Sequence, residues 1–201
     1  LKLYGNAKSS TTQTKYLTSS MYFDGTGDYV KVAPAFSQFF NMTGPYTIEF
    51  WFYADGAQSN NYPTIFGTAS SSWATGAMGI RYSPTGYANK VAIVRNGSNN
   101  VATGYPIISS STYAVDTWHH VALSRDASNN WRLFVNGSET GTSITESSAH
   151  NWAHGDHSRI GNNIWDGAAS AFKGYVSDLR ITKGLARYTA NFTPPTAALK
   201  G

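Results

Sequence analysis

The chain has 201 residues, of which 41% are hydrophobic and 14% aromatic, and it carries a formal net charge of +4 and no cysteine. This apolar content suffices for a sizeable core and excludes wholesale disorder. The lack of cysteine excludes disulfide frameworks and thiolate metal sites, and no run of about 18 apolar residues is present to span a membrane. We therefore expect a single folded domain over residues 1–201, without membrane insertion.

The two ends of the chain differ from its middle. The chain starts at Leu1 without a methionine or an apolar leader, which suggests a segment of a longer polypeptide. Residues 1–20 are largely polar and predict an N-terminal arm or edge segment. Residues 183–201 contain Pro194-Pro195, which stops strand pairing, and they predict a C-terminal tail that wraps back over the sheets.

Strand patterns fill the middle of the chain. In YTIEFWFYA, Ile48, Phe50 and Phe52 fall on one face of a pleated strand. Residues 118–126 and 131–137 flank a polar turn and predict an antiparallel hairpin, and the Asn136-Gly137 pair at its end predicts a second tight turn. Short strands between Gly, Asn and Ser clusters predict an all-β fold, a two-sheet antiparallel β-sandwich of the jelly-roll type.

Six stretches carry a resemblance to a known family, and they are SMYFDGTGDYVKV, YTIEFWFY, TWHHVALSRD, WRLFVNG, RIGNN and FKGYVSDLRI. In this order and spacing the chain resembles laminin-G-like, concanavalin-A-like jelly rolls. GNAKSSTTQTKYLTSSMYFDGTGDYV and DLRITKGLARYTANFTPP resemble the versions found in bacteriophage virion proteins, often tail or fibre modules. The resemblance implies an extracellular-facing place on a virion, contacts with other virion proteins, a homo-oligomer through the parent protein and recognition of host cell-surface glycans.

The first function hypothesis is a non-catalytic, lectin-like carbohydrate-binding module. Sugar sites need an exposed aromatic ring beside amide and carboxylate groups. Two loop stretches, SSSWATG and GNNIWDG, offer such groups, and the candidate ligand-binding residues are Trp73, Asn162, Asn163, Trp165 and Asp166. The alternative for a loop tryptophan is a plug at the end of the sandwich. The strand tryptophans are predicted as core or sheet-face residues, and they are Trp51, Trp118 and Trp131.

Two other function classes compete with sugar binding. A structural or assembly module of a capsid or tail, with no small ligand, fits the same fold. A glycan-cleaving enzyme is not favoured, because retaining glycosidases need two carboxyls about 5–5.5 Å apart. The glutamates Glu49, Glu139 and Glu146 have no acidic neighbour two or four residues away in a strand. We therefore predict no catalytic residues and no enzyme.

A break in the strand pattern suggests a structural calcium ion. In GYVSDLRI the step from Val176 to Leu179 is odd, which predicts a bulge at Ser177-Asp178. In FDGTGDYV two aspartates bracket a glycine turn, and laminin-G-like jelly rolls often carry calcium on such oxygen ligands. The candidate ligands are Asp24, Asp28 and Asp178. The alternative is that the first two aspartates cap their own turn.

Basic residues gather near the C-terminus, and they are Lys173, Arg180, Lys183, Arg187 and Lys200. Such a segment could meet nucleic acid or an acidic glycan, but no two basic residues are adjacent, so we favour a solvated surface and expect no nucleic-acid partner. The stretch HNWAHGDH could hold zinc through its imidazoles, and a solvated loop is the favoured alternative. The residues concerned are His150, His154, Asp156 and His157.

Overall fold

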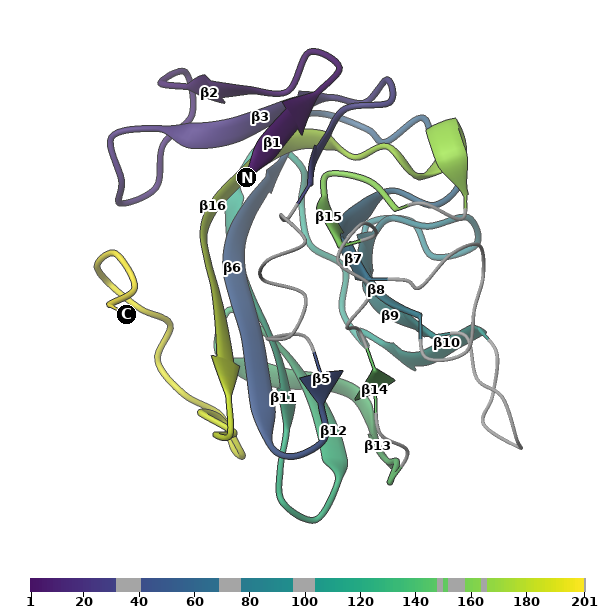
Figure 1. Cartoon of the computed structure of the whole chain (residues 1–201), viewed down its shortest axis with the longest axis vertical. Helices are drawn as coiled ribbons and strands as arrows, with labels where there is room; N and C mark the ends of the chain where they lie inside the picture. Colours follow the sequence, from purple (N-terminus) through teal and green to yellow (C-terminus); the bar gives the residue numbers. More distant parts are fainter. Residues whose placement is uncertain are drawn as a thin grey trace.

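The computed structural model describes residues 1–31, 41–68, 77–95, 104–147, 150–151, 158–163 and 166–200. Two antiparallel seven-stranded sheets pack against each other (Figure 1). In the described part, regular helix is limited to one 3-10 turn at Gly167–Ser170, and no helix there is long and apolar enough to cross a membrane. The predicted all-β, two-sheet architecture is confirmed.

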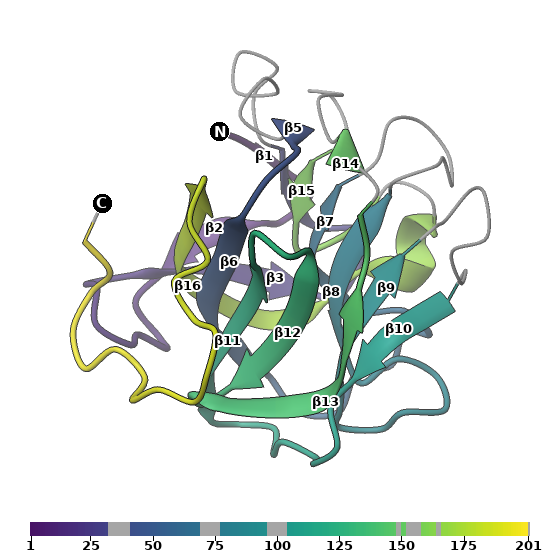
Figure 2. The same cartoon turned by 90° about the horizontal axis from the view of Figure 1, so that it is seen from below.

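The two sheets are named A and B. Sheet A has the order β1 (Lys2–Tyr4), β4 (Tyr29–Lys31), β15 (Arg159–Ile160), β7 (Thr64–Thr68), β8 (Met78–Tyr82), β9 (Val91–Arg95) and β10 (Gly104–Ile108). Sheet B has the order β13 (Ser138–Thr145), β12 (Asn130–Val135), β11 (Trp118–Arg125), β6 (Tyr46–Ala54), β16 (Lys173–Lys183), β3 (Ser20–Asp24) and β2 (Lys8–Ser10). A small third ladder pairs β14 (His150–Asn151) with β5 (Asn41–Met42). Figure 2 shows the layers from below.

Strand alternation decides which side chains form the core between the sheets. Along β6, Ile48, Phe50 and Phe52 belong to the core and are fully buried. Glu49 and Trp51 lie on the opposite, outer face of sheet B, because successive side chains point to opposite faces. Each buried core side chain stabilises the fold by about 1.5–3 kcal/mol. The predicted alternation is confirmed.

The three strand tryptophans lie where the pattern predicted. Trp131 is fully buried in the core. Trp51 lies on the outer face of sheet B, where the Lys15 ammonium is 4.2 Å from its ring centroid and the Tyr16 ring packs edge-on at 5.6 Å. Trp118 lies on the same face and is partly exposed. The N-terminal segment therefore covers part of this outer face.

Both predicted turns join neighbouring strands. β11 pairs with β12 around a turn in which Asp126 accepts hydrogen bonds from the backbone N–H groups of Ser128 and Asn130. β12 pairs with β13 around Asn136 and Gly137, which have φ angles of 51° and 80°. Consecutive positive φ angles are typical of the two-residue hairpin turns that Asn-Gly favours. Both hairpins are confirmed.

The N-terminal strand motif and GYVSDLRI are adjacent. β16 pairs with β3 on one side and with β6 on the other. Its register with β6 shifts between Ser177 and Arg180, and Asp178 has a φ of 59°. The predicted bulge is confirmed. It aims the Asp178 carboxylate at the backbone N–H of Leu199, which donates to it over 2.6 Å.

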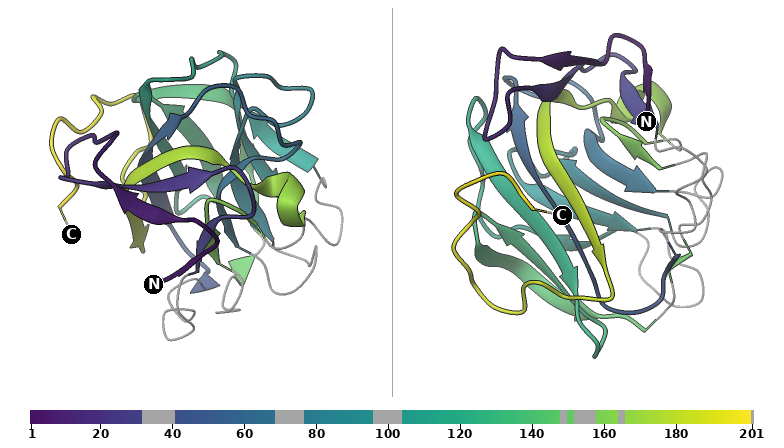
Figure 3. Two further views of the ribbon diagram at one scale, coloured as in Figure 1. Left: turned by 90° about the horizontal axis from the view of Figure 1, so that it is seen from above. Right: turned by 60° about the vertical axis from the view of Figure 1, so that its left-hand side comes forward.

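The C-terminal tail, residues 184–200, runs across the outer face of sheet B (Figure 3). The rings of Tyr188 and Phe192 stack with centroids 3.6 Å apart and pack edge-on against His120 and Phe134. The Phe192 N–H donates to the carbonyl of Gly137 over 2.8 Å. The tail thus covers a region of the sheet that the N-terminal segment leaves open.

A buried carboxylate lies beneath the tail. Glu49 has 0% exposure, and its Oε1 accepts hydrogen bonds from Nε and Nη2 of Arg180 over 2.9 and 2.7 Å. Its Oε2 accepts from the Tyr188 hydroxyl over 2.8 Å and lies 3.3 Å from Nε2 of His120. The prediction of a solvated basic surface is therefore wrong for Arg180, because this guanidinium is held by a buried carboxylate.

Acid should weaken the fold through Glu49. Burial raises the pKa of this carboxyl, but the nearby His120 imidazole, the hydrogen bonds from Arg180 and Tyr188 and the charge of Arg180 outweigh burial and lower the pKa. A carboxyl with a lowered folded-state pKa stabilises the fold above its unfolded pKa, and the contribution is lost as pH falls through the folded pKa. We expect denaturant titrations to show a falling free energy of unfolding below about pH 4.5.

The variant Glu49→Gln provides the control for this pH dependence. At neutral pH it should lower the free energy of unfolding by roughly 3 kcal/mol, because it leaves the Arg180 charge without its partner. It should also flatten the acid dependence, since glutamine does not titrate. An acid slope as steep as that of the wild type would show that other carboxyls cause it.

A methyl group at Gly137 should displace the tail. Gly137 has a φ of 80°, and a Cβ there would overlap the carbonyl oxygen of Phe192. Gly86 is a matched control, because it has a φ of 85° and no described atom within 4 Å of such a Cβ. Gly86→Ala should cost about 1–2 kcal/mol of unfolding free energy from backbone strain alone. Gly137→Ala should cost about 1–3 kcal/mol more, and equal losses in denaturant melts would contradict the tail contact.

Candidate functional site

A buried arginine lies on the outer face of sheet A. Ile80 and Tyr82 of β8 belong to the core, so Arg81 between them points to the other face. Register places Arg81 opposite Thr64 of β7 on one side and Ala92 of β9 on the other. Its side chain is only 3% exposed. A buried guanidinium needs partners for its charge and its N–H groups.

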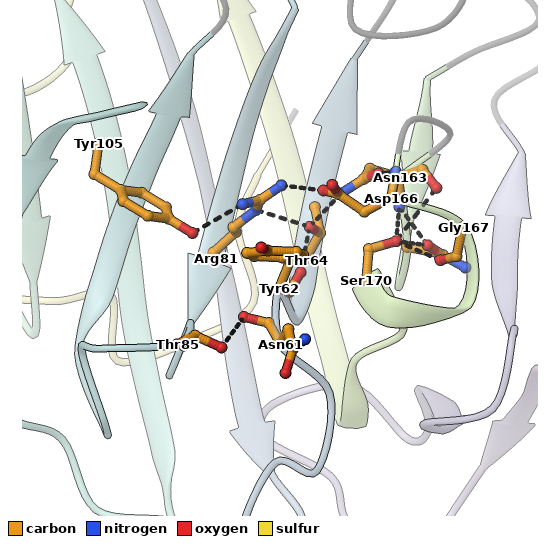
Figure 4. Close-up of polar contacts among 11 residues, drawn as sticks. Asn61, Tyr62, Thr64, Arg81, Thr85, Tyr105, Asn163, Asp166, Gly167 and Ser170 are labelled. Atoms are coloured by element: carbon orange, nitrogen blue, oxygen red, sulfur yellow. Dashed lines mark hydrogen bonds and ion pairs between the residues drawn. The ribbon is translucent and has the colours of Figure 1, made fainter. Parts of the chain in front are cut away.

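The partners of Arg81 come from three elements (Figure 4). Nε donates to the Thr64 hydroxyl over 3.3 Å, and Nη1 donates to the Tyr105 hydroxyl over 2.9 Å. Nη2 forms an ion pair with Asp166. The Thr64 hydroxyl also accepts from Nδ2 of Asn163 over 2.8 Å. Together with Tyr62, these residues are called the Arg81 cluster.

Tyrosine rings surround the guanidinium. Its carbon lies 4.9 Å from the ring centroid of Tyr62 and 5.6 Å from that of Tyr105, distances typical of cation–π contacts. Tyr87 packs edge-on against Tyr105 with centroids 5.5 Å apart, and all three rings are partly exposed. Burial raises the pKa of Tyr105 although Arg81 lowers it, so the phenol stays protonated at neutral pH. Tyr105 therefore accepts from Arg81 and keeps a proton to donate.

The GNNIWDG loop delivers Asp166 to this cluster. Asn163 Nδ2 donates to Asp166 Oδ2 over 3.0 Å, and the Asp166 N–H donates to Asn163 Oδ1 over 2.8 Å. Asn162 accepts from the Asn163 N–H over 2.6 Å and from the Ser170 hydroxyl. A Cβ on Gly67 would lie 3.1 Å from that of Asn163, so the glycine lets the loop lie close on the sheet. The loop base is thereby fixed.

The five predicted ligand-binding residues differ in exposure and in whether the structure describes them. Asn162 and Asn163 are only 3% and 0% exposed, so their amides position the loop from below. Asp166 keeps 21% of its side chain exposed beside Arg81. Trp73 and Trp165 lie outside the described residues. The structure thus brings three of the five together beside β7, an inner strand of sheet A.

Sequence reasoning missed Arg81, Tyr62 and Tyr105. One signal was present, because an arginine inside the apolar strand MGIRY has to be paired or exposed. The tyrosines gave no such signal, since an aromatic residue in or next to a strand is as often part of the core as it is part of a binding site. Only the fold brings β7, β8 and β10 together beside the loop.

The structure does not assemble the predicted calcium ligands. Asp28 is fully buried, and its two oxygens accept from the N–H groups of Asn6 and Asp24 over 2.5 and 2.8 Å. Asp24 accepts from the Thr26 N–H over 2.7 Å, as a turn aspartate does. Register places Lys173 opposite Asp24, so Asp178 lies five positions further along β16.

The described residues contain no group of three or more His, Asp or Glu side chains that could hold a metal ion. His154, His157 and Asp156 of the histidine stretch lie outside the described residues, and of His150 only the backbone is described. The calcium ion stays a prediction from the sequence, without the three-aspartate geometry that motivated it.

Each glutamate contacts an arginine. Glu49 binds Arg180, Glu146 forms a buried ion pair with Arg95, and Glu139 lies 3.8 Å from Nε of Arg132. β6 and β13 place Glu49 and Glu139 in sheet B, on the side away from the Arg81 cluster. The carboxylate of the cluster is instead Asp166, which is paired with a cation.

Comparison with known families shows to which protein family the chain belongs. Residues 24–186 match the family model of the Concanavalin A-like lectin/glucanases superfamily. The chain belongs to this superfamily. The matched range includes every described residue of the Arg81 cluster, and it confirms the family expected from the motifs. No curated protein sequence matches the chain.

Solved structures share the fold of this superfamily domain at low sequence identity. Domain 4 of AbnA, a GH43 extracellular arabinanase from Geobacillus stearothermophilus in complex with arabinotriose, is 18% identical with a TM-score of 0.63, over 91% of this chain and 78% of that chain. The CBM40 of Ruminococcus gnavus IT-sialidase bound to alpha2,3 sialyllactose is 12% identical with a TM-score of 0.62, over 86% and 91%. At such identities the likeness shows the fold alone.

Replacing Asp28 should show whether its role is structural or metal-binding. In EDTA, Asp28→Asn should lower the free energy of unfolding by about 1–3 kcal/mol. The NH₂ group of asparagine cannot accept a hydrogen bond, so one of the two backbone N–H groups loses its acceptor. Calcium bound only by the folded wild type would raise its melting temperature with concentration. A calcium-dependent rise that Asp28→Asn abolishes would support the ion, and identical wild-type melts would leave both aspartates as turn residues.

Proposed function

We propose that this domain is a non-catalytic carbohydrate-binding module and that the Arg81 cluster is its sugar site. The observation that carries the proposal is a rigidly held group of polar side chains, Arg81 and Asp166, bordered by three partly exposed tyrosine rings. Sugars present apolar C–H faces and a rim of hydroxyls, so aromatic rings beside hydrogen-bonding groups complement them.

The chemistry of the cluster favours hydroxyl recognition. The Arg81 charge is paired with Asp166, so the pair offers donors and acceptors with little net charge. The Tyr105 hydroxyl is fixed by Arg81 and has a proton to donate to a ligand oxygen. Asn163 holds Asp166 through two hydrogen bonds, so the Asp166 side chain loses little conformational entropy when a ligand binds. The Arg81 cluster therefore suits an uncharged sugar better than an anionic one.

Two further observations support a binding role without catalysis. The exposed carboxylate of the cluster is paired with a cation, which disfavours its use as a general acid. The fold is shared with an arabinanase domain whose structure holds arabinotriose and with a CBM40 bound to sialyllactose. These relatives bind sugars on the same scaffold, and fold alone does not transfer their ligands.

The biological setting is the finer part of the proposal. The sequence motifs of the chain resemble those of bacteriophage tail and fibre modules, so we place the domain on the outside of a virion, where it would bind a host cell-surface glycan. There it would contact other virion proteins, and oligomerisation of the parent protein would raise the avidity of weak single sites. Competition of the purified domain with virion adsorption to host cells tests this setting.

Removing one hydroxyl should weaken sugar binding. Tyr105→Phe keeps the ring and loses the group that joins Arg81 to the ligand. On a glycan array followed by titration calorimetry, we expect the dissociation constant for the best glycan to rise about threefold to tenfold, the usual worth of one hydrogen bond. Tyr62→Ala, which removes a ring surface, should have at least as large an effect.

The matched control is Tyr4→Phe. Tyr4 stacks on Tyr29 with ring centroids 4.5 Å apart on the edge strand β1, away from the cluster. This variant should bind like the wild type. If the wild type binds no glycan on the array while the domain still assembles tightly with another virion protein, the structural-module alternative is favoured instead.

A further inference from the structure

Four aromatic residues form a continuous row across the outer face of sheet B. Register places Tyr22 of β3 opposite Tyr175 of β16, Tyr175 opposite Tyr53 of β6, and Tyr53 opposite Trp118 of β11. The neighbours of Tyr53 in sequence, Phe52 and Ala54, are core-facing, so the row faces outward. Its members come from four adjacent strands, so the row runs across the strand direction.

The rings of the aromatic row touch one another in sequence. Their centroids are 4.9 Å apart for Tyr22 and Tyr175, 5.8 Å for Tyr175 and Tyr53, and 5.7 Å for Tyr53 and Trp118. Tyr175, in the middle, is 7% exposed, whereas the other three are partly exposed. The row therefore exposes the rings of Tyr22, Tyr53 and Trp118, and Tyr175 is buried between the first two.

Polar groups border the aromatic row on its loop side. Lys173 and Asp55 lie two positions from Tyr175 and Tyr53 on the same face, with Nζ and Oδ2 3.7 Å apart and side chains 41% and 39% exposed. At one end the Lys8 ammonium is 5.6 Å from the Tyr22 ring centroid. Both signs of charge are present, so the border supplies hydrogen-bond donors and acceptors together.

The rest of this outer face is covered by the chain itself. Lys15 and Tyr16 lie against Trp51, and the tail rings of Tyr188 and Phe192 lie over the region of Glu49. In the described part of the chain no ring or cation packs on Tyr53 or Trp118 from outside the row. Partly exposed aromatic side chains gathered on one face are a feature of interaction surfaces.

We propose that the aromatic row is a second binding surface, for a linear, uncharged polysaccharide. Successive sugar rings of such a polymer can lie along the row with their C–H faces on the aromatic rings. Their hydroxyls then reach the mixed border of Asp55, Lys173 and Lys8, which gives no advantage to a polyanion or a polycation. A row that spans four strands fits several consecutive sugars, so the ligand is a chain and not a monosaccharide.

This surface is independent of the sugar site proposed above. The Arg81 cluster lies on the outer face of sheet A and the aromatic row on the outer face of sheet B, with the core between them. One domain could thus hold two polymer strands, or one branched polymer, and gain avidity from the second contact. Failure of one site does not imply failure of the other.

Cross-strand aromatic pairs also stabilise sheets without any ligand, so the experiment has to separate packing from binding. The readout is affinity electrophoresis in native gels that contain amylose, hydroxyethyl cellulose, linear arabinan or linear mannan, with a polyproline peptide as competitor. The variants are Tyr53→Ala and Trp118→Ala, and circular dichroism melts check that each is folded. Tyr53→Phe keeps the ring and provides a readout if the alanine variant does not fold.

We expect at least one neutral polymer to retard the wild type, with the apparent affinity reduced about tenfold in Tyr53→Ala and Trp118→Ala and largely kept in Tyr53→Phe. The matched control Tyr4→Ala, which truncates a stacked surface tyrosine on sheet A, should be retarded like the wild type.

Three results would overturn the proposal. The first is no retardation of the wild type by any neutral polymer. The second is retardation that polyproline abolishes, which would make the row a peptide surface. The third is loss of retardation in Tyr105→Phe but not in the row variants, which would assign the polymer to the Arg81 cluster and support the proposed function alone.

Discussion

The arrangement of the C-terminal tail depends on the hydrogen bonds and ion pair of the buried Glu49 carboxylate. A charge taken out of water needs several partners, and here Arg180, Tyr188 and His120 supply them from β16, the tail and β11. A strand glutamate on the outer face of a sheet would ordinarily be solvated. In this protein it fixes the tail across sheet B, and the stacked rings of Tyr188 and Phe192 exclude water from it.

The two outer faces of the sandwich differ in the residues they carry and in what covers them. The outer face of sheet A carries the Arg81 cluster, a polar site with its own internal ion pair. Both ends of the chain cover parts of the outer face of sheet B, and three rings of the aromatic row stay partly exposed there. A β-sandwich usually exposes polar residues on both outer faces, so these departures are where function is expected. The superfamily fold supports either site without deciding between them.

Acidic residues in this chain are used mainly to hold backbone and cations. Asp28 binds two backbone N–H groups, Asp178 binds that of Leu199, and Asp166 pairs with Arg81. The sequence pattern predicted Asp28 and Asp178 as calcium ligands and Asp166 as a sugar-binding residue. The difference is physical, because a carboxylate satisfied by backbone donors has lost much of its capacity for a cation.

The sandwich, the hairpins and the bulge at Asp178 could be predicted from the sequence, because strand alternation and turn residues are local signals. The sequence also pointed to the GNNIWDG loop. Only the tertiary structure decided that Asn163 is buried, that Arg81 and Tyr105 join Asp166, and that Arg180 pairs with Glu49. These contacts join residues far apart in the chain, and their formation depends on sheet order and register, which no short stretch of sequence encodes.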